Sequence, residues 1–150
     1  GSMLLARNNI LKTAVAMGAT TNQVLRVGLH TETTSTTQPV SGVWWEANPA
    51  ASGRWRYCYG DGAAATCADL TTPTLVADTW VRLEIRVTAT GTGTSAVTFI
   101  INGTFVTLTN ITVDTTNRVS PAYSCYTTTV TAQNCYWDYF QLKGTAAAAR

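Results

Sequence analysis

The stretch WVRLEIRVTATGTGTSAVTFIINGTFVTL, residues 80–108, decides the fold of this chain. In its first part, apolar residues at the odd positions 81 to 87 alternate with larger polar or aromatic residues at the even positions. The residues at the even positions are Trp80, Arg82, Glu84 and Arg86. A period of two is typical of a β-strand that buries one face, so residues 80–87 are predicted to form such a strand.

The second part of the stretch predicts a β-hairpin. Residues 97–101 and 104–108 are joined by Asn102-Gly103, a pair that tolerates the positive φ angles of a tight turn. A two-residue turn gives one apolar face that can pack on a second sheet, so we predict a β-sandwich. The expected partners are Ile101 with Thr104, Phe99 with Val106, and Val97 with Leu108.

Length and composition limit the protein class. A chain of 150 residues fits one domain. We expect a remnant of an expression tag over residues 1–3, the sandwich over 4–143 and a flexible tail or end of the expressed segment over 144–150. The charged fraction is 12% and the net charge is +2, whereas a nucleic-acid-binding protein is usually strongly basic. No apolar run is long enough for a membrane span.

Similar patterns predict further strands. Apolar and aromatic runs separated by Gly, Pro, Asn and Asp are typical of strands and turns. The polar segment 31–41 is predicted to be a long loop that could carry function. The further strands are expected at residues 10–17, 24–30, 42–47, 54–59, 65–70, 111–118, 122–129 and 134–142.

The four cysteines form two close pairs in the sequence, Cys58 with Cys67 and Cys125 with Cys135. Three connectivities are open, and proximity favours these local pairs, each of which would clip a hairpin. Two disulfides indicate an extracellular or particle-surface protein. The alternative is four reduced cysteines that pack as small apolar residues.

The order of these motifs resembles a known family. The runs VLRVGLH, GVWWEA, RWRYCYGDG, DTWVRLEIRV, VTFIINGTFV and WDYFQLKG follow one another as in the concanavalin A-like lectin/glucanase jelly roll, in the variant found in bacteriophage tail and virion proteins. The resemblance implies two curved antiparallel sheets with the last strand near the first. Such domains usually have further strands before the position of Ile10, so we expect an edge open to pairing with another chain.

Exposed aromatic residues beside charged ones suggest a sugar-binding surface. On residues 42–47 and 54–59, alternation turns some of these side chains away from the core, where rings could stack on sugars and charged tips could bond to hydroxyls. The candidates for glycan binding are Trp44, Glu46, Arg54 and Arg56. The alternative is that these aromatics serve packing alone.

The run Arg82-Leu83-Glu84-Ile85-Arg86 resembles the R-x-E-x-R motif of jelly-roll alginate lyases, which helps neutralise a substrate carboxylate. Two departures argue against such an enzyme. The single histidine, His30, precedes this run instead of following it, and YFQLKG does not match the Tyr-rich C-terminal motif. The alternative is a ladder of charges on a solvent face. No catalytic residues are therefore expected.

No cofactor is expected either. Asp61 and Asp69 flank a Gly-rich loop and could ligate calcium, although aspartate in a turn usually serves the turn itself. The cysteine spacings do not match a zinc site.

We therefore expect a non-catalytic, lectin-like module on a virion surface or another extracellular assembly, with a surface glycan or host polysaccharide as partner. The first alternative is a purely structural virion subunit of an oligomer such as a trimer, whose aromatic face contacts other subunits. The second alternative is a polysaccharide lyase or hydrolase of the same fold. Because a fold hosts many functions, the choice depends on the site.

Overall fold

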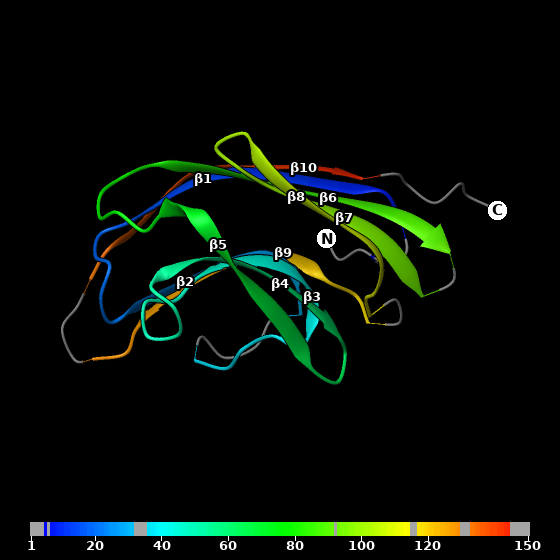
Figure 1. Cartoon of the computed structure of the whole chain (residues 1–150), viewed down its shortest axis with the longest axis horizontal. Coiled ribbons are helices and arrows are strands. Elements are labelled where there is room, and N and C mark those ends of the chain that lie inside the picture. Colours follow the sequence, from blue (N-terminus) through cyan, green and yellow to red (C-terminus); the bar gives the residue numbers. More distant parts are fainter. Residues whose placement is uncertain are drawn as a thin grey trace.

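The computed structural model describes residues 5, 7–31, 36–91, 93–114, 117–129 and 133–144. These residues form two stacked β-sheets (Figure 1). The expected tag remnant and residues 145–150 of the expected tail lie outside the described residues. Within the described part, no helix is long and apolar enough to cross a membrane.

Ten strands make up the described fold. In chain order they are β1 (Asn9–Met17), β2 (Gln23–His30), β3 (Ser41–Ala47), β4 (Arg54–Asp61), β5 (Ala65–Thr74), β6 (Val81–Gly91), β7 (Thr94–Ile101), β8 (Thr104–Thr112), β9 (Ser120–Thr127) and β10 (Cys135–Gly144).

Each sheet has five antiparallel strands. Sheet 1 has the order β10-β1-β6-β7-β8, and sheet 2 has the order β5-β4-β3-β2-β9. The all-β jelly-roll sandwich predicted from the sequence is confirmed. The last strand pairs with the first, as the resemblance implied.

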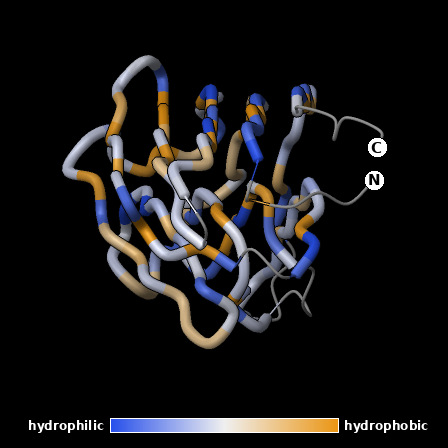
Figure 2. The backbone as a smooth tube through the Cα atoms, turned by 90° about the vertical axis from the view of Figure 1, so that its right-hand side faces the viewer, coloured by the Kyte–Doolittle hydropathy of each residue, from blue (hydrophilic) through white to orange (hydrophobic). Residues whose placement is uncertain are grey.

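The core lies between the two sheets. Apolar residues of both sheets make up this core, and apolar and polar residues are interspersed along much of the backbone (Figure 2). Phe99 of sheet 1 meets two rings of sheet 2, with ring centroids 5.4 Å from both Trp45 and Tyr57. This burial of large rings from both layers holds the sheets together through the hydrophobic effect.

The predicted hairpin between β7 and β8 has the expected register. Ile101 pairs with Thr104 and Phe99 with Val106. Asn102 and Gly103 adopt φ angles of 48° and 87°, the left-handed region that this turn requires. The sequence signal for this element is therefore confirmed residue by residue.

Two strand predictions near the C-terminus are wrong. The expected strand 111–118 does not form. Its first two residues belong to β8, which ends at Thr112, and the chain leaves the sheet at Val113 and Asp114. The expected hairpin of 122–129 with 134–142 is not formed either, because β9 joins sheet 2 and β10 joins sheet 1. The two segments therefore connect the layers instead of pairing with each other.

The pairing of β1 with β10 contains a β-bulge. Thr13 pairs with Phe140 and Val15 with Trp137, so the single residue Ala14 lies opposite two residues of β10. A bulge locally breaks the alternation of side chains and can re-aim one of them. This bulge lies next to the candidate site described below.

Candidate functional site

The outer face of sheet 2 carries the glycan-binding residues expected from the sequence, but it is closed. Trp44 is 0% exposed and Glu46 is 1% exposed. The Glu46 carboxylate accepts a hydrogen bond from Arg26 Nε at 2.7 Å and another from Arg56 Nη1 at 3.3 Å. Glu46 therefore lies in a buried cluster of charges, Trp44 is buried as well, and neither forms the accessible sugar surface that we expected.

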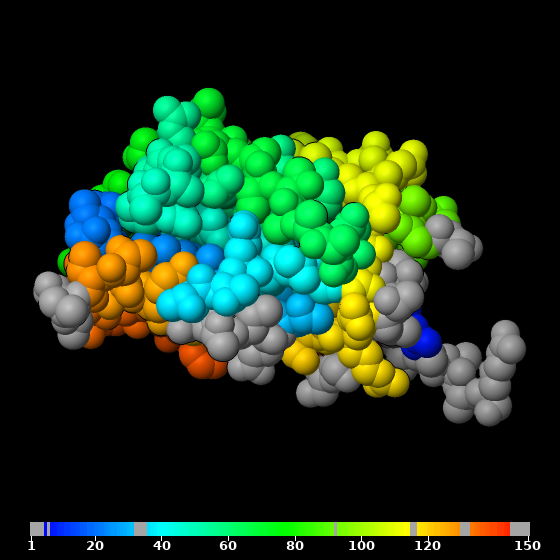
Figure 3. Space-filling view, turned by 90° about the horizontal axis from the view of Figure 1, so that it is seen from below, coloured from blue at the N-terminus to red at the C-terminus, as the bar shows by residue number. Residues whose placement is uncertain are grey.

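Part of the predicted polar loop covers this face. The carbonyl oxygen of Thr37 accepts a hydrogen bond from Arg26, and the Gln38 amide donates one to the sulfur of Cys67. Seen from this side, the cyan residues that follow position 35 run across the middle of the face (Figure 3). Arg54 is exposed. Arg56 forms ion pairs with two carboxylates, those of Glu46 and, at 3.0 Å, Asp69.

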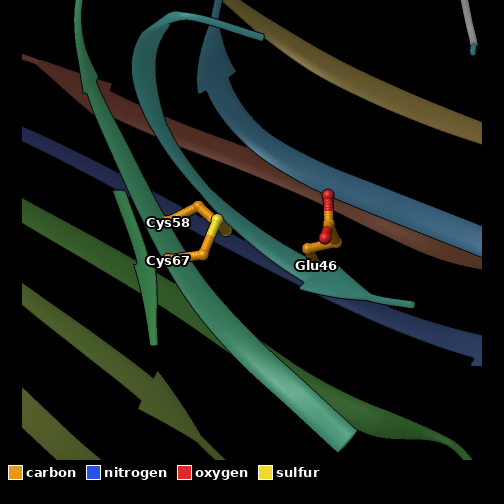
Figure 4. Close-up of side chains that lie close together, drawn as sticks. All are labelled: Glu46, Cys58 and Cys67. Carbon is orange, nitrogen blue, oxygen red and sulfur yellow. A yellow bond between two sulfur atoms is a disulfide. The ribbon is translucent and has the colours of Figure 1, made fainter. Parts of the chain in front are cut away.

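Both local disulfides are present. Cys58 bonds to Cys67 across β4 and β5, and Cys125 bonds to Cys135. The second disulfide links β9 to β10 and therefore connects the two sheets, instead of clipping a hairpin as expected. Among the described residues, one group with potential metal-ligand atoms is Glu46, Cys58 and Cys67 (Figure 4). Its sulfur atoms are bonded to each other, and its carboxylate is held by two arginines.

The two aspartates considered for calcium are engaged separately. Asp61 Oδ1 accepts hydrogen bonds from the backbone N–H groups of Ala63 and Ala64, which lowers the pKa of this carboxyl group. Asp69 pairs with Arg56. Asp61 therefore stabilises its own turn, as aspartate commonly does.

An open groove lies on the outer face of sheet 1. Its volume is about 1150 Å³, and its lining comes from β1, β6, β7, β8 and β10 and from the connections beside them. The side chains that carry charge or a ring in this lining are Lys12, Trp80, Arg82, Glu84, Arg86, Phe105, Asp138 and Tyr139. The face that displays the R-x-E-x-R run is thus a hollowed face of the molecule.

Cations outnumber carboxylates in the groove. Glu84 accepts a hydrogen bond from Arg86 Nε at 2.6 Å and lies 3.6 Å from Lys12 Nζ. The hydrogen bond to Glu84 raises the pKa of Arg86 above its usual value, so this cation is permanent. Arg82 is exposed and has no carboxylate partner among the described residues. Its guanidinium group can therefore bind an incoming carboxylate.

The bulge in β10 places a phenol in the same groove. Asp138 and Tyr139 are consecutive, yet both line the groove because together they face Ala14. The buried Thr13 hydroxyl donates a hydrogen bond of 2.6 Å to the Tyr139 carbonyl oxygen and fixes the backbone there. The Tyr139 side chain is 40% exposed. A tyrosine hydroxyl is a group that can give or take a proton.

His30 does not belong to this groove. It lies on β2 in sheet 2, is buried, and contacts the Trp44 ring with centroids 5.9 Å apart. Tyr139, by contrast, belongs to the YFQLKG run that the sequence analysis set aside. The signal for Lys12 was weaker still, because only the pairing of β1 with β6 brings it opposite Glu84.

Comparison with known proteins gives similarity in structure alone. No family model and no curated protein sequence matches this chain. A family 7 alginate lyase solved in complex with substrate has a TM-score of 0.60 at 12% identity, over 100% of this chain and 66% of that chain. An endo-β-1,4-glucuronan lyase from the fungus Trichoderma reesei has a TM-score of 0.55 at 10% identity, over 93% of this chain and 69% of that chain.

The same fold also occurs in the mouse laminin α1 chain, whose domains LG4-5 have a TM-score of 0.51 at 11% identity, over 95% of this chain and 39% of that chain. At such identities these likenesses establish the jelly-roll fold. This chain spans about two thirds of the length of the alginate lyase.

These neighbours correct two expectations. The non-catalytic lectin-like module, and with it the absence of enzymatic activity, is the weaker interpretation, because structures of polysaccharide lyases share the architecture over nearly the whole chain. The lyase alternative fits better. None of the three neighbours described above supports the bacteriophage context.

Proposed function

We propose that this protein is a polysaccharide lyase that cleaves a uronate-containing polymer in the groove of sheet 1. The observation that carries the proposal is Arg82, which has no carboxylate partner in the described part of the chain and lies in an open, cation-rich groove over the R-x-E-x-R run. The fold shared with lyases of alginate and glucuronan supports the same substrate class.

The chemistry requires three things of the site. In β-elimination, the C5–H and C4–O4 bonds of the uronate break, a C4=C5 double bond forms, and the proton from C5 is balanced by one delivered to O4. Negative charge develops on the C5 carboxylate, so cations that face it stabilise the transition state. A group that transfers protons must also lie nearby.

This chain offers a residue for each requirement. Arg82 is the candidate for binding the reacting carboxylate, with Arg86 and Lys12 contributing positive charge on the same face. Tyr139 is the candidate for proton transfer at C5 and O4. Glu84 bridges Lys12 and Arg86 and so fixes their side chains.

The test is digestion of alginate, glucuronan and a neutral glucan, followed through the ultraviolet absorbance of the unsaturated product. We expect product from at least one acidic polymer and none from the neutral one. Arg82→Gln and Tyr139→Phe are expected to lower kcat/KM about 100-fold. Arg54→Gln, which changes an exposed arginine of sheet 2, is the matched control and should leave kcat/KM unchanged. Absence of product from every uronate polymer contradicts the proposal.

An extracellular location belongs to this proposal, because a lyase meets such polymers outside cells and the two disulfides suit an oxidising compartment. The bacteriophage context rests on the order of sequence motifs alone.

A further inference from the structure

We infer that the groove binds one polysaccharide chain across the strands of sheet 1, and that Phe105 and Trp80 are aromatic platforms for sugar units away from the reacting one. This inference rests on the proposed function for its substrate class. It adds where the chain runs, that several of its units lie in the groove, and which residues hold the remote units.

The register of the strands defines the path. Gln141 pairs with Lys12, Lys12 with Glu84, Glu84 with Ile100, and Ile100 with Phe105. These pairs form one row that runs from β10 to β8. Because neighbouring strands lie about 4.8 Å apart, the row is about 19 Å long. A single sugar ring covers only a fraction of that length, so the groove accommodates several consecutive units.

Two exposed rings line the groove near the turn between β7 and β8. Phe105 is 68% exposed and Trp80 is 51% exposed. They lie near one end of sheet 1, because Trp80 directly precedes β6 and Phe105 follows the turn at Asn102-Gly103. The backbone N–H of Arg82 donates to Asn102 Oδ1, which ties that turn to the start of β6.

The exposure of these two rings is better explained by a role in binding a ligand than by a role in packing the fold. The core rings Trp45 and Phe99 are fully buried, whereas Phe105 leaves most of its apolar surface in water. Pyranose rings present apolar C–H faces that pack on aromatic rings, and the charged groups between Phe105 and Tyr139 match the carboxylates of a polyuronate. The ligand of this surface is therefore an acidic polysaccharide, bound at several of its units.

The experiment measures binding of uronate oligosaccharides of two to six units by calorimetry, in a Tyr139→Phe background in which cleavage is expected to be about 100-fold slower. We expect affinity to rise with length in this parent. Phe105→Leu should lower affinity for the hexamer about tenfold, a loss of about 1.4 kcal/mol, while leaving the dimer unchanged, since the ring contacts remote units alone. Phe105→Tyr, which keeps the ring, should bind like the parent, and Trp80→Leu should also lower affinity for the hexamer.

The control is Val40→Ala, which removes exposed apolar surface outside the groove and should bind the hexamer like the parent. Equal hexamer affinity in the parent and in Phe105→Leu overturns the inference, as does a Phe105→Tyr variant that binds as weakly as Phe105→Leu. Length-dependent binding lost in Phe105→Leu, together with no cleavage by the wild type, supports the inference and refutes the lyase. No binding of any oligouronate refutes both.

Discussion

Glu46 illustrates how much a single buried residue constrains this fold. Its carboxylate is 1% exposed and neutralises Arg26, which is itself buried, while it also pairs with Arg56. Burying a charge costs several kcal/mol unless a partner in good geometry compensates it. Each member of this cluster therefore depends on the others.

We expect Glu46→Gln to reduce the free energy of unfolding by about 3 kcal/mol, because the change leaves two arginines without their shared counter-charge. Urea denaturation measures the loss. Arg54→Gln, at an exposed position of the same sheet, should change stability by no more than about 0.5 kcal/mol. A Glu46→Gln protein as stable as the wild type would show that the cluster is dispensable.

Tyr123 is a second single residue with a predictable effect, here on stability at alkaline pH. Its hydroxyl has no hydrogen-bond partner among the described residues, and burial raises its pKa from 10.0 to about 12. The folded state thus favours the neutral phenol. This contribution to stability is complete below pH 10 and is lost as the pH rises from 10 to about 12.

Tyr123→Phe keeps the ring that stacks on Trp137 and removes the titrating group. We expect the variant to be at least as stable as the wild type at neutral pH and to gain on it progressively above pH 10. Thermal unfolding at a series of pH values measures this difference. Parallel curves for the two proteins across that range would contradict the assignment of the pKa shift to this residue.

At the scale of single elements, the bulge of β10 decides what the groove contains. Without it, strict alternation would turn either Asp138 or Tyr139 away from the outer face. Thr13 lies beside the bulge and holds the Tyr139 carbonyl oxygen through its hydroxyl. A residue of β1 thereby positions a side chain of β10.

We expect Thr13→Val, which preserves shape and removes the hydroxyl, to reduce stability by about 1 kcal/mol and to lower turnover in the proposed lyase reaction more than substrate affinity. Denaturation and steady-state kinetics measure the two effects. Thr127→Val is the matched control. Thr127 is the last residue of β9 in the other sheet, and its hydroxyl donates to the carbonyl oxygen of Thr129. Similar kinetic effects of both substitutions would argue against a positioning role for Thr13.

The sequence predicted elements well where the signal was local. Asn102-Gly103 identified a turn and its register because few residues adopt its backbone angles. The strand expected at 111–118 failed because apolar spacing does not mark where β8 ends. Trp44 was misplaced for a different reason: alternation correctly turned it away from the core, but it could not reveal that a polar segment distant in sequence covers that face.

The site could be predicted only in part. The R-x-E-x-R run carries its own pattern, so its three charged residues were recognised on one face. Lys12 lies on β1, which pairs with β6, and Tyr139 lies on β10, which pairs with β1; neither pairing can be read from the sequence. The bulge that brings Tyr139 to the outer face has no sequence signature here either. The pairing of strands distant in sequence therefore decides which further residues line the groove, and the motif alone does not predict it.

At the scale of the whole molecule, the two disulfides act on different parts. Cys58–Cys67 joins neighbouring strands of sheet 2, whereas Cys125–Cys135 connects the sheets at the start of β10. The sequence separations of 9 and 10 give nearly equal loop entropies, so each disulfide contributes about 2 to 3 kcal/mol.

We expect the double substitutions Cys58→Ala/Cys67→Ala and Cys125→Ala/Cys135→Ala to lose similar stability, with different effects on function. Only the second pair releases β10, which carries Tyr139, and it alone should lower turnover in the proposed lyase reaction at a temperature where both variants remain folded. Denaturation and product absorbance provide the two measurements. Equal activity of the two variants would indicate that β1 holds β10 in place without the disulfide.

The closed outer face of sheet 2 has a consequence for how this protein can change over evolution. Arg26, Glu46 and Arg56 are joined by ion pairs, and Arg26 also donates to the Thr37 carbonyl oxygen, so a substitution at one position requires compensation at the others. The row of side chains that crosses sheet 1 carries no such burden, because its members are exposed or only half-buried. Descendants of this chain can therefore vary the outer face of sheet 1 by drift while the opposite side of the sandwich stays constant.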